Sequence, residues 1–103
     1  FARLGAQVTQ VEMLPRIMIR EDPEISAMVA RRFREEGIAV LTGHKAKRFL
    51  REDGEKVLIA EHEGRDVRIP FDAVLVAVGR VANTAGYGLE ELGIGTTKAR
   101  TVE

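Results

Sequence analysis

The chain has 103 residues, of which 45% are hydrophobic and 31% charged, a composition typical of one small globular domain. Sixteen basic residues balance sixteen acidic ones, so the charge gives no reason to expect a nucleic-acid or membrane partner. The absence of cysteine excludes disulfides and cysteine-ligated metals in this sequence. We expect a cytoplasmic protein.

Both ends of the sequence look like interrupted elements. Residues 1–4 are typical of the last turn of a helix, and Gly5 follows at the position where a left-handed residue ends many helices. The chain has no initial methionine and stops at "ARTVE", where a strand is expected to begin. We therefore interpret residues 1–103 as part of a larger protein.

The first predicted strand covers residues 6–13 and ends on Glu12, a carboxylate between apolar residues. Pro15 then prevents a continuous element. A helix is predicted from Asp22, a favourable N-cap, to Gly37. Its apolar face is formed by residues spaced three and four apart: Ile25, Met28, Val29 and Phe33. A second strand at residues 38–43 completes a parallel strand–helix–strand unit, for which we predict a right-handed crossover.

Three short antiparallel strands are predicted next, over residues 44–71. Asp53-Gly54 separates the first two strands and Gly64 the second two, and both are typical of tight hairpin turns. The nearly continuous apolar run at residues 73–78 predicts a strand that is covered on both faces. A loop-rich stretch follows, with one helical turn expected at residues 89–92.

Glu12 is the candidate binding residue. In dinucleotide-binding folds, a carboxylate at the end of the second strand accepts hydrogen bonds from the adenosine ribose hydroxyls. The same charge repels a 2′-phosphate and therefore favours NAD over NADP. Considered alone, a carboxylate that only ends a strand and faces water explains Glu12 at least as well. No GxGxxG phosphate loop occurs in this sequence.

The sequence contains four informative stretches: "FARLGAQVTQVEMLPRI", "EDPEISAMVARRFREEGIAVLTG", "DAVLVAVGRVANT" and "LEELGI". In this order and spacing they resemble the NAD(P)-binding domain of the pyridine nucleotide-disulfide oxidoreductases, the flavoprotein family of lipoamide dehydrogenase, glutathione reductase and mercuric reductase. The resemblance implies an α/β fold for residues 1–103. We expect an incomplete Rossmann-like NAD-binding domain, whose βαβ unit lacks its first strand, with a three-stranded antiparallel meander.

The resemblance also implies which residues bind the cofactor. Glu12 matches the ribose-binding carboxylate. Independently of the resemblance, its apolar neighbours Met13 and Leu14 are expected to flank the adenine. Ala46 matches a position whose backbone meets the adenine end of the cofactor. Gly79 matches a glycine that lets the backbone approach the dinucleotide closely, and Arg80 belongs to the same motif. The alternative for Gly79 and Arg80 is a plain turn after a buried strand. For the side chain of Ala46, we favour the interpretation that it is only a small strand residue.

The parent protein implied by this resemblance is an enzyme that passes hydride between NAD(P)H, FAD and a cysteine pair. Its FAD-binding domain, redox cysteines and C-terminal interface domain would lie outside residues 1–103, so this chain alone is not expected to be catalytic. FAD would bind mainly outside the chain, and the parent is expected to be a homodimer. One departure is "GRVAN", in which Ala82 stands where the family usually has proline.

Two signals disagree about the nucleotide. "VTQVEML" resembles the NAD-linked lipoamide dehydrogenases, whereas "REDPEI" at residues 20–25 resembles mercuric reductases, which typically use NADPH. Because Glu12 would repel a 2′-phosphate, we predict NAD. Arg16 and Arg20 are interpreted as solvated loop arginines rather than phosphate ligands.

Two other classes of function stay open: a non-catalytic NAD-sensing module, and a methyltransferase-type domain that holds the ribose of S-adenosylmethionine. Neither normally has three antiparallel strands before an apolar strand such as residues 73–78, which favours the reductase.

His44 and His62 lack further ligands at metal spacing and are interpreted as strand-surface residues. Ser26 has no nearby base and is not a candidate nucleophile.

The expected strand order makes one structural prediction. In the Rossmann order 3-2-1-4, the absent first strand would lie between the strand at residues 6–13 and that at residues 73–78. Unpaired backbone and exposed apolar surface are expected at that place. We predict that the chain rearranges or self-associates to cover this surface.

Overall fold

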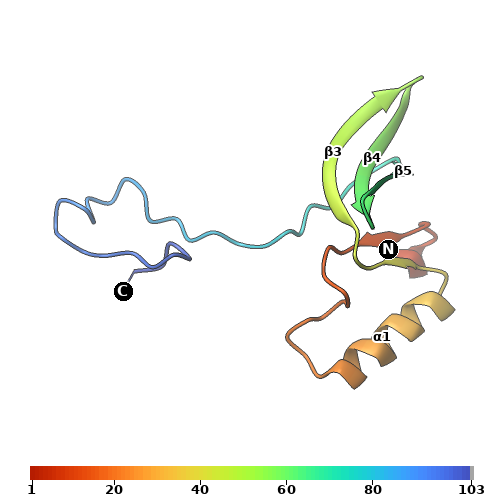
Figure 1. Ribbon diagram of the computed structural model, residues 1–103, viewed down its shortest axis with the longest axis horizontal. Helices are drawn as coiled ribbons and strands as arrows, with labels where there is room; N and C mark the ends of the chain where they lie inside the picture. The colour runs from red at the N-terminus through yellow and green to blue at the C-terminus, as the bar shows by residue number, and fades with distance from the viewer. Residues whose placement is uncertain (103) are drawn as a thin grey trace. The chain divides into compact units, whose positions relative to one another are not determined.

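The computed structural model describes residues 1–102 and forms two compact units, Phe1–Ala73 and the residues from Val74 onward. The first unit contains all the named strands and helices (Figure 1). It opens with a short 3-10 helix, η1 (Ala2–Leu4), which Gly5 ends with a φ of 94°. This left-handed conformation is the helix end that the sequence predicts.

β1 (Thr9–Val11) and β2 (Ala39–Leu41) form a two-stranded parallel sheet. The backbone N–H of Glu12 also donates to the carbonyl of Leu41, at 2.9 Å, so the pairing continues as far as Glu12. The parallel pairing is therefore confirmed, whereas both strands are shorter than predicted.

The helix α1 (Pro23–Glu35) connects these two strands and contacts β2. Its bounds agree with the prediction, with Asp22 at the N-cap and Gly37 just beyond its end. The side chain of Asp22, however, makes no capping hydrogen bond. The apolar face is only partly covered, because Ile25 and Met28 keep 41% and 50% of their surface exposed.

The antiparallel meander is confirmed. It consists of β3 (Lys45–Glu52), β4 (Glu55–His62) and β5 (Arg65–Phe71), in the spatial order β3-β4-β5 (Figure 1). Both hairpin turns have two successive residues with positive φ, at Asp53-Gly54 and Glu63-Gly64. This is the backbone of the primed two-residue turns whose twist matches that of the flanking strands.

The main buried cluster lies on β4, where four successive residues are shielded from solvent: Val57, Leu58, Ile59 and Ala60. Successive side chains of a strand point to opposite faces, so both faces of β4 are covered. This burial explains why the sequence of the strand lacks a clean polar face.

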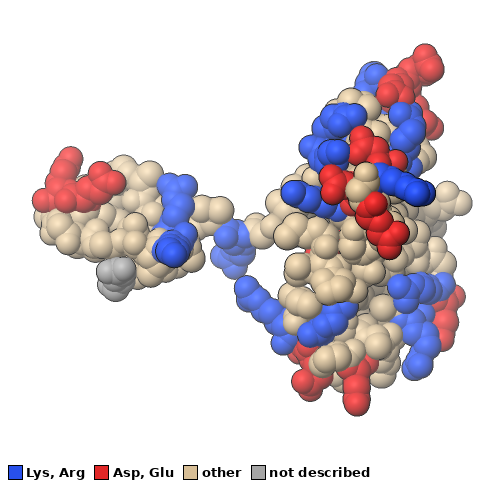
Figure 2. All heavy atoms as spheres, in the orientation of Figure 1, with Lys and Arg blue, Asp and Glu red and all other residues tan. Residues whose placement is uncertain are grey.

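Charged side chains of both signs are interspersed over the face of the molecule that Figure 2 shows.

The prediction of a strand at residues 73–78 is wrong. No strand is formed there, and Leu75 and Val78 expose 78% and 90% of their surface. A strand requires a neighbour to satisfy its backbone hydrogen bonds, and none of the strands within residues 1–102 pairs with this segment. Local apolar character therefore does not suffice to form it.

The remaining part of the second unit is made of turns. Hydrogen bonds from Leu92 to Gly88 and from Ile94 to Leu89 form the single helical turn that the sequence predicts. One isolated antiparallel bridge joins Thr96 and Val102. Within residues 1–102, no helix combines the length and the hydrophobicity that a membrane-spanning segment requires.

Candidate functional site

Glu12 lies at the carboxyl end of β1 and is half-buried. Its Oε1 atom accepts a hydrogen bond of 2.8 Å from the backbone N–H of Leu14. No described residue bonds to Oε2, and that atom is not enclosed, because no buried side-chain oxygen of the described residues lacks a partner. One carboxylate oxygen therefore fixes the side chain, while the other is free to accept hydrogen bonds from a ligand.

The segment of residues 13–22 between β1 and α1 is termed the connecting loop. Within it, the guanidinium of Arg16 donates to the carbonyls of Glu21 and Ile19, at 2.7 and 3.0 Å. Arg16 is half-buried and is a loop arginine as expected, with its side chain bonded to its own loop. Both contacts use N–H groups of its guanidinium, so the side chain of Arg16 is engaged within the loop. Arg20 is exposed, as expected.

Ser26 ties the same loop to α1. Its hydroxyl donates to the backbone carbonyl of Ile17 at 2.5 Å, and the two residues are 1% and 2% exposed. The hydroxyl belongs to the only polar residue in the buried core of the described chain, and its hydrogen bond offsets the cost of that burial.

His44 and His62 meet where β2 passes into the meander. Their rings stack in parallel at a centroid distance of 4.0 Å, and their Nδ1 atoms contact the carbonyls of Thr42 and Gly43. Both residues are half-buried, so their interpretation as strand-surface residues is only partly correct. The backbone N–H of His44 donates to the carbonyl of Glu12 at 2.9 Å. The start of the meander is therefore held against the end of β1.

Two predicted site residues lie near this junction. Met13 follows Glu12 directly and exposes 63% of its surface. Ala46 lies in β3 opposite Ala60 of β4, next to a register shift between Ala46 and Arg48. Since β3 is an edge strand, the backbone groups on its outer side are not paired with another strand. Both residues thus offer accessible contact surface, apolar from Met13 and backbone from Ala46.

The other two predicted site residues, Gly79 and Arg80, belong to the second unit and are exposed. Gly79 has a φ of 128°, a conformation that L-amino acids rarely adopt, so glycine is favoured by the backbone itself. A Cβ atom there would meet no protein atom within 4 Å. Glycine is therefore not required by packing within the described residues of the second unit.

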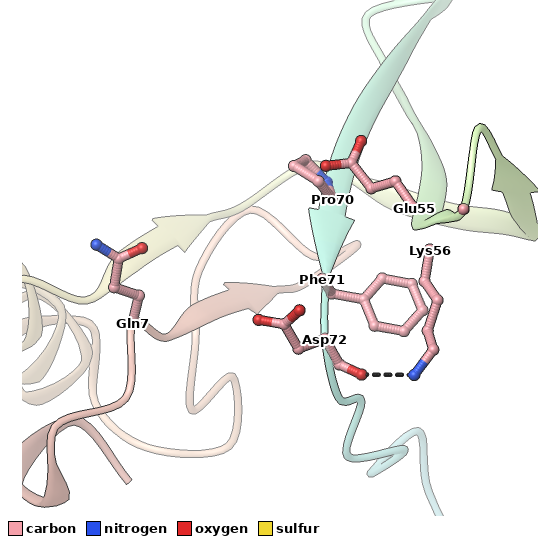
Figure 3. A pocket seen from close by; sticks show the side chains of 7 residues that line it. Gln7, Glu55, Lys56, Pro70, Phe71 and Asp72 are labelled. Atoms are coloured by element: carbon pink, nitrogen blue, oxygen red, sulfur yellow. Dashed lines mark hydrogen bonds between the residues drawn. The ribbon is translucent and has the colours of Figure 1, made fainter.

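A separate recess lies at the far end of the first unit (Figure 3). Its volume is about 310 Å³, and it is lined by residues from the start of β4, the end of β5 and the segment before β1. The side chain of Lys56 reaches the backbone carbonyl of Asp72 at 2.8 Å. Because Gln7 lines the recess and precedes β1, the recess lies toward the amino end of that strand, opposite to Glu12.

The residues around Glu12 fit the adenosine half of a dinucleotide. They provide one free carboxylate oxygen, an exposed thioether side chain and an edge strand. A pyrophosphate requires clustered backbone N–H donors at a glycine-rich turn, and this sequence contains no GxGxxG. The described residues also contain no group of three side chains placed to hold a metal ion.

The contacts made by Leu14 and Ser26 were not predicted from the sequence. The backbone N–H of Leu14 leaves no signature in the sequence. Ser26 leaves one, because it lies three residues before Val29 and seven before Phe33, on the apolar face of α1. A polar residue on such a face indicates a buried hydrogen-bond partner.

The parallel pair with its crossover helix, the carboxylate that ends β1 and the antiparallel meander define the chain as a mixed α/β protein. A family model described as pyridine nucleotide-disulphide oxidoreductase matches residues 1–103. The chain belongs to this family.

Similar proteins agree with this assignment. The chain is 38% identical over 100 residues to dihydrolipoyl dehydrogenase of Mycobacterium leprae, a match that covers 96% of this chain. It is 43% identical over 98 residues to mercuric reductase of Streptomyces lividans, covering 93% of this chain. The HOCl-induced flavoprotein disulfide reductase RclA from Escherichia coli has a similar structure, with a TM-score of 0.82 and 25% identity over 99% of this chain.

These relatives are oxidoreductases and are much longer than this chain. The matched region is 21% of the Mycobacterium leprae protein, 20% of the Streptomyces lividans protein and 22% of RclA. The chain therefore spans about a fifth of the length of the relatives it matches.

Proposed function

We propose that residues 1–103 are a partial NAD(P)-binding domain of an FAD-dependent pyridine nucleotide-disulfide oxidoreductase of the lipoamide dehydrogenase type. The nicotinamide dinucleotide bound by this domain exchanges hydride with FAD, which is held mainly by other domains of the enzyme. The observation that carries the proposal is the carboxylate of Glu12, fixed through one oxygen at the end of a parallel strand. Family membership supports the class of reaction.

In this proposal, the free Oε2 atom of Glu12 accepts hydrogen bonds from the hydroxyls of the adenosine ribose. A 2′-phosphate at the same place would bring negative charge against the carboxylate, which is unfavourable at hydrogen-bond distance. The site therefore selects NAD over NADP. The backbone N–H of Leu14 is already used by Oε1 and supports the orientation of the carboxylate.

The other predicted residues have supporting roles. The exposed side chain of Met13 lies against the adenine, and the backbone at Ala46 meets the adenine end of the cofactor. Gly79 lets the main chain approach the dinucleotide, a role with which the open space around its Cα is compatible. Arg80 follows it in the same motif. The pyrophosphate, the FAD and the second subunit of a homodimer are contacted by parts of the enzyme outside this chain.

The test compares the full-length enzyme with its Glu12→Gln variant, which keeps the shape of the side chain and removes its charge. We expect kcat/KM for NADH, measured by flavin reduction, to fall about tenfold or more, since hydrogen bonds to charged groups are the stronger ones. The value for NADPH should stay the same or rise.

Glu21→Gln is the matched control, because Glu21 is an exposed carboxylate of the connecting loop that does not end β1. This variant should leave the ratio of the two nucleotides unchanged. An equal preference for NADH in the wild type and in the Glu12→Gln variant would show that Glu12 only ends a strand. A full-length protein that reduces no flavin with either nucleotide would overturn the proposed reaction.

A second candidate is an NADPH-dependent enzyme of the mercuric reductase type. It is favoured by the 43% identity to the Streptomyces lividans protein and by the "REDPEI" segment. The engaged guanidinium of Arg16 leaves Arg20 as the loop arginine for a 2′-phosphate in this case. The same kinetic comparison separates the two candidates, because this one requires the wild-type enzyme to prefer NADPH.

A further inference from the structure

The way the connecting loop is fixed bears on how Glu12 is presented. Leu14 contributes both of its backbone groups, because its N–H donates to Oε1 of Glu12 and its carbonyl accepts a 3.0 Å hydrogen bond from Gly43. The orientation of the carboxylate thus depends on the position of the main chain at Leu14. Whatever fixes that segment also fixes the side chain that faces the ligand.

The backbone of the connecting loop includes one residue in an unfavourable conformation. Met18 has a φ of 51°, in the left-handed region that a long side chain rarely occupies. Such a conformation persists only where the surrounding contacts determine it. The contacts around it are the hydrogen bond of 2.9 Å that the Met18 carbonyl accepts from the N–H of Glu21, the two hydrogen bonds of Arg16 within the loop, and the buried hydrogen bond between Ser26 and Ile17.

Among these contacts, the one made by Ser26 is the anchor. It joins the loop to α1 rather than to itself, and both partners are almost fully buried. The carbonyl of Ile17 lies three residues after Leu14, so a shift at Ile17 is passed along a short stretch of main chain. Without the hydroxyl, this buried carbonyl would also lose its partner, which favours a rearrangement of the loop.

We propose that Ser26 is a positioning residue for nucleotide selectivity: its hydroxyl anchors the connecting loop at Ile17 and thereby holds the Glu12 carboxylate in the orientation that receives a ribose 2′-hydroxyl. This inference rests on the proposed function of Glu12. Ser26 itself touches no ligand. Its removal should therefore affect the binding of NADH more than the hydride transfer that follows.

The test uses the full-length enzyme and its Ser26→Ala variant, with flavin reduction followed for both nucleotides. We expect KM for NADH to rise about three- to tenfold, as for the loss of one neutral hydrogen bond, while kcat changes by less than about twofold. KM for NADPH should not rise, because that nucleotide gains nothing from the Glu12 orientation. In a Glu12→Gln background, Ser26→Ala should have no further effect on NADH.

The control variant is Ala27→Gly, which weakens α1 at the neighbouring exposed position but keeps the hydroxyl of Ser26. It should lower thermal stability without changing the ratio of NADH to NADPH. Arg16→Gln provides a second way to loosen the loop from an accessible position, which is useful if Ser26→Ala fails to fold. It should shift the ratio in the same direction.

Three results would overturn the inference while leaving the proposed function intact: equal effects of Ser26→Ala on both nucleotides, an effect that persists in the Glu12→Gln background, or an unchanged ratio in both loop variants. An unchanged preference in Glu12→Gln itself would instead overturn the role of Glu12, and the inference would fall with it.

Discussion

Arg3 and Glu36 form the clearest side-chain contact between segments distant in the sequence. The guanidinium of Arg3 donates to both carboxylate oxygens of Glu36, at 2.7 and 3.1 Å, and so joins η1 to the end of α1. Arg32 donates to the same carboxylate at 3.0 Å. The hydrogen bond from Arg3, with the charges of both arginines, holds the pKa of Glu36 below its ordinary value.

This contact predicts a pH-dependent stability. Because the pKa of Glu36 is lower in the folded state, its contribution is complete above the unfolded value of 4.5 and is lost as the pH falls through the folded value. The difference in melting temperature between the wild type and Arg3→Ala should therefore be present at neutral pH and shrink in acid. Added salt should also reduce it, because Arg3 is exposed.

Thermal melts at several pH values would measure this difference. Arg34→Ala is a suitable control, since Arg34 forms no ion pair within residues 1–102 and lies in the same last turn of α1. A difference between wild type and Arg3→Ala that stays constant from neutral to acid pH would contradict the role given to Glu36.

Among the elements, β4 carries the hydrophobic core of the first unit. It pairs with β3 from Glu55 to Glu61 on one side and with β5 from Lys56 to His62 on the other. The rings of Phe49 and Phe71 meet edge to face at 5.7 Å across this sheet. Ion pairs between the two outer strands β3 and β5, such as Lys47 with Asp66 and Arg68 with Glu52, lie at its surface and add little stability each.

Shortening a β4 side chain should therefore be costly. Ile59 is 3% exposed, and we expect Ile59→Ala to lower the free energy of unfolding by about 2–5 kcal/mol through lost burial and a residual cavity. The matched control is Ile25→Ala, the same chemical change at a position that is 41% exposed on a helix. Urea denaturation should give a much smaller loss for the control, and comparable losses for both variants would contradict the placement of the core.

For the whole molecule, the main feature is apolar surface left uncovered. In the second unit, Leu75, Val76 and Val78 expose 78%, 63% and 90% of their surface. In the first unit, β1 pairs with a strand on one side only. Exposed apolar runs of this kind mark interaction surfaces or sites of aggregation. Apolar surface is exposed as expected, but the sheet order on which that prediction rested is not formed, and self-association stays a prediction.

We expect residues 1–103, studied as a separate chain, to associate with increasing concentration and to bind a hydrophobic dye. Leu75→Lys combined with Val78→Lys should reduce both signals, because two charges interrupt the apolar run. Asn83→Lys with Ala85→Lys adds the same charge at exposed positions outside that run and should not. Light scattering that shows a monomer with little dye binding would refute the prediction.

How far the sequence predicts the fold depends on the range of the interactions involved. Local signals determined the bounds of α1 through Asp22 and Gly37, and the two hairpins through Asp53-Gly54 and Gly64, because capping and turn preferences act over a few residues. The parallel pairing of β1 with β2 followed from the order of elements. These features are all present in the structure.

The sequence was sufficient to predict Glu12 as a candidate binding residue, because the apolar residues around it show that it ends a strand. How the carboxylate is held depends on tertiary contacts: the N–H of Leu14 and the carbonyls that accept from Ser26 and Arg16 are backbone groups, whose positions side-chain identity does not specify. The failure at residues 73–78 has the same origin. A strand exists only with a hydrogen-bonding neighbour, and that condition is set by chain segments far apart in sequence, not by the apolar run itself.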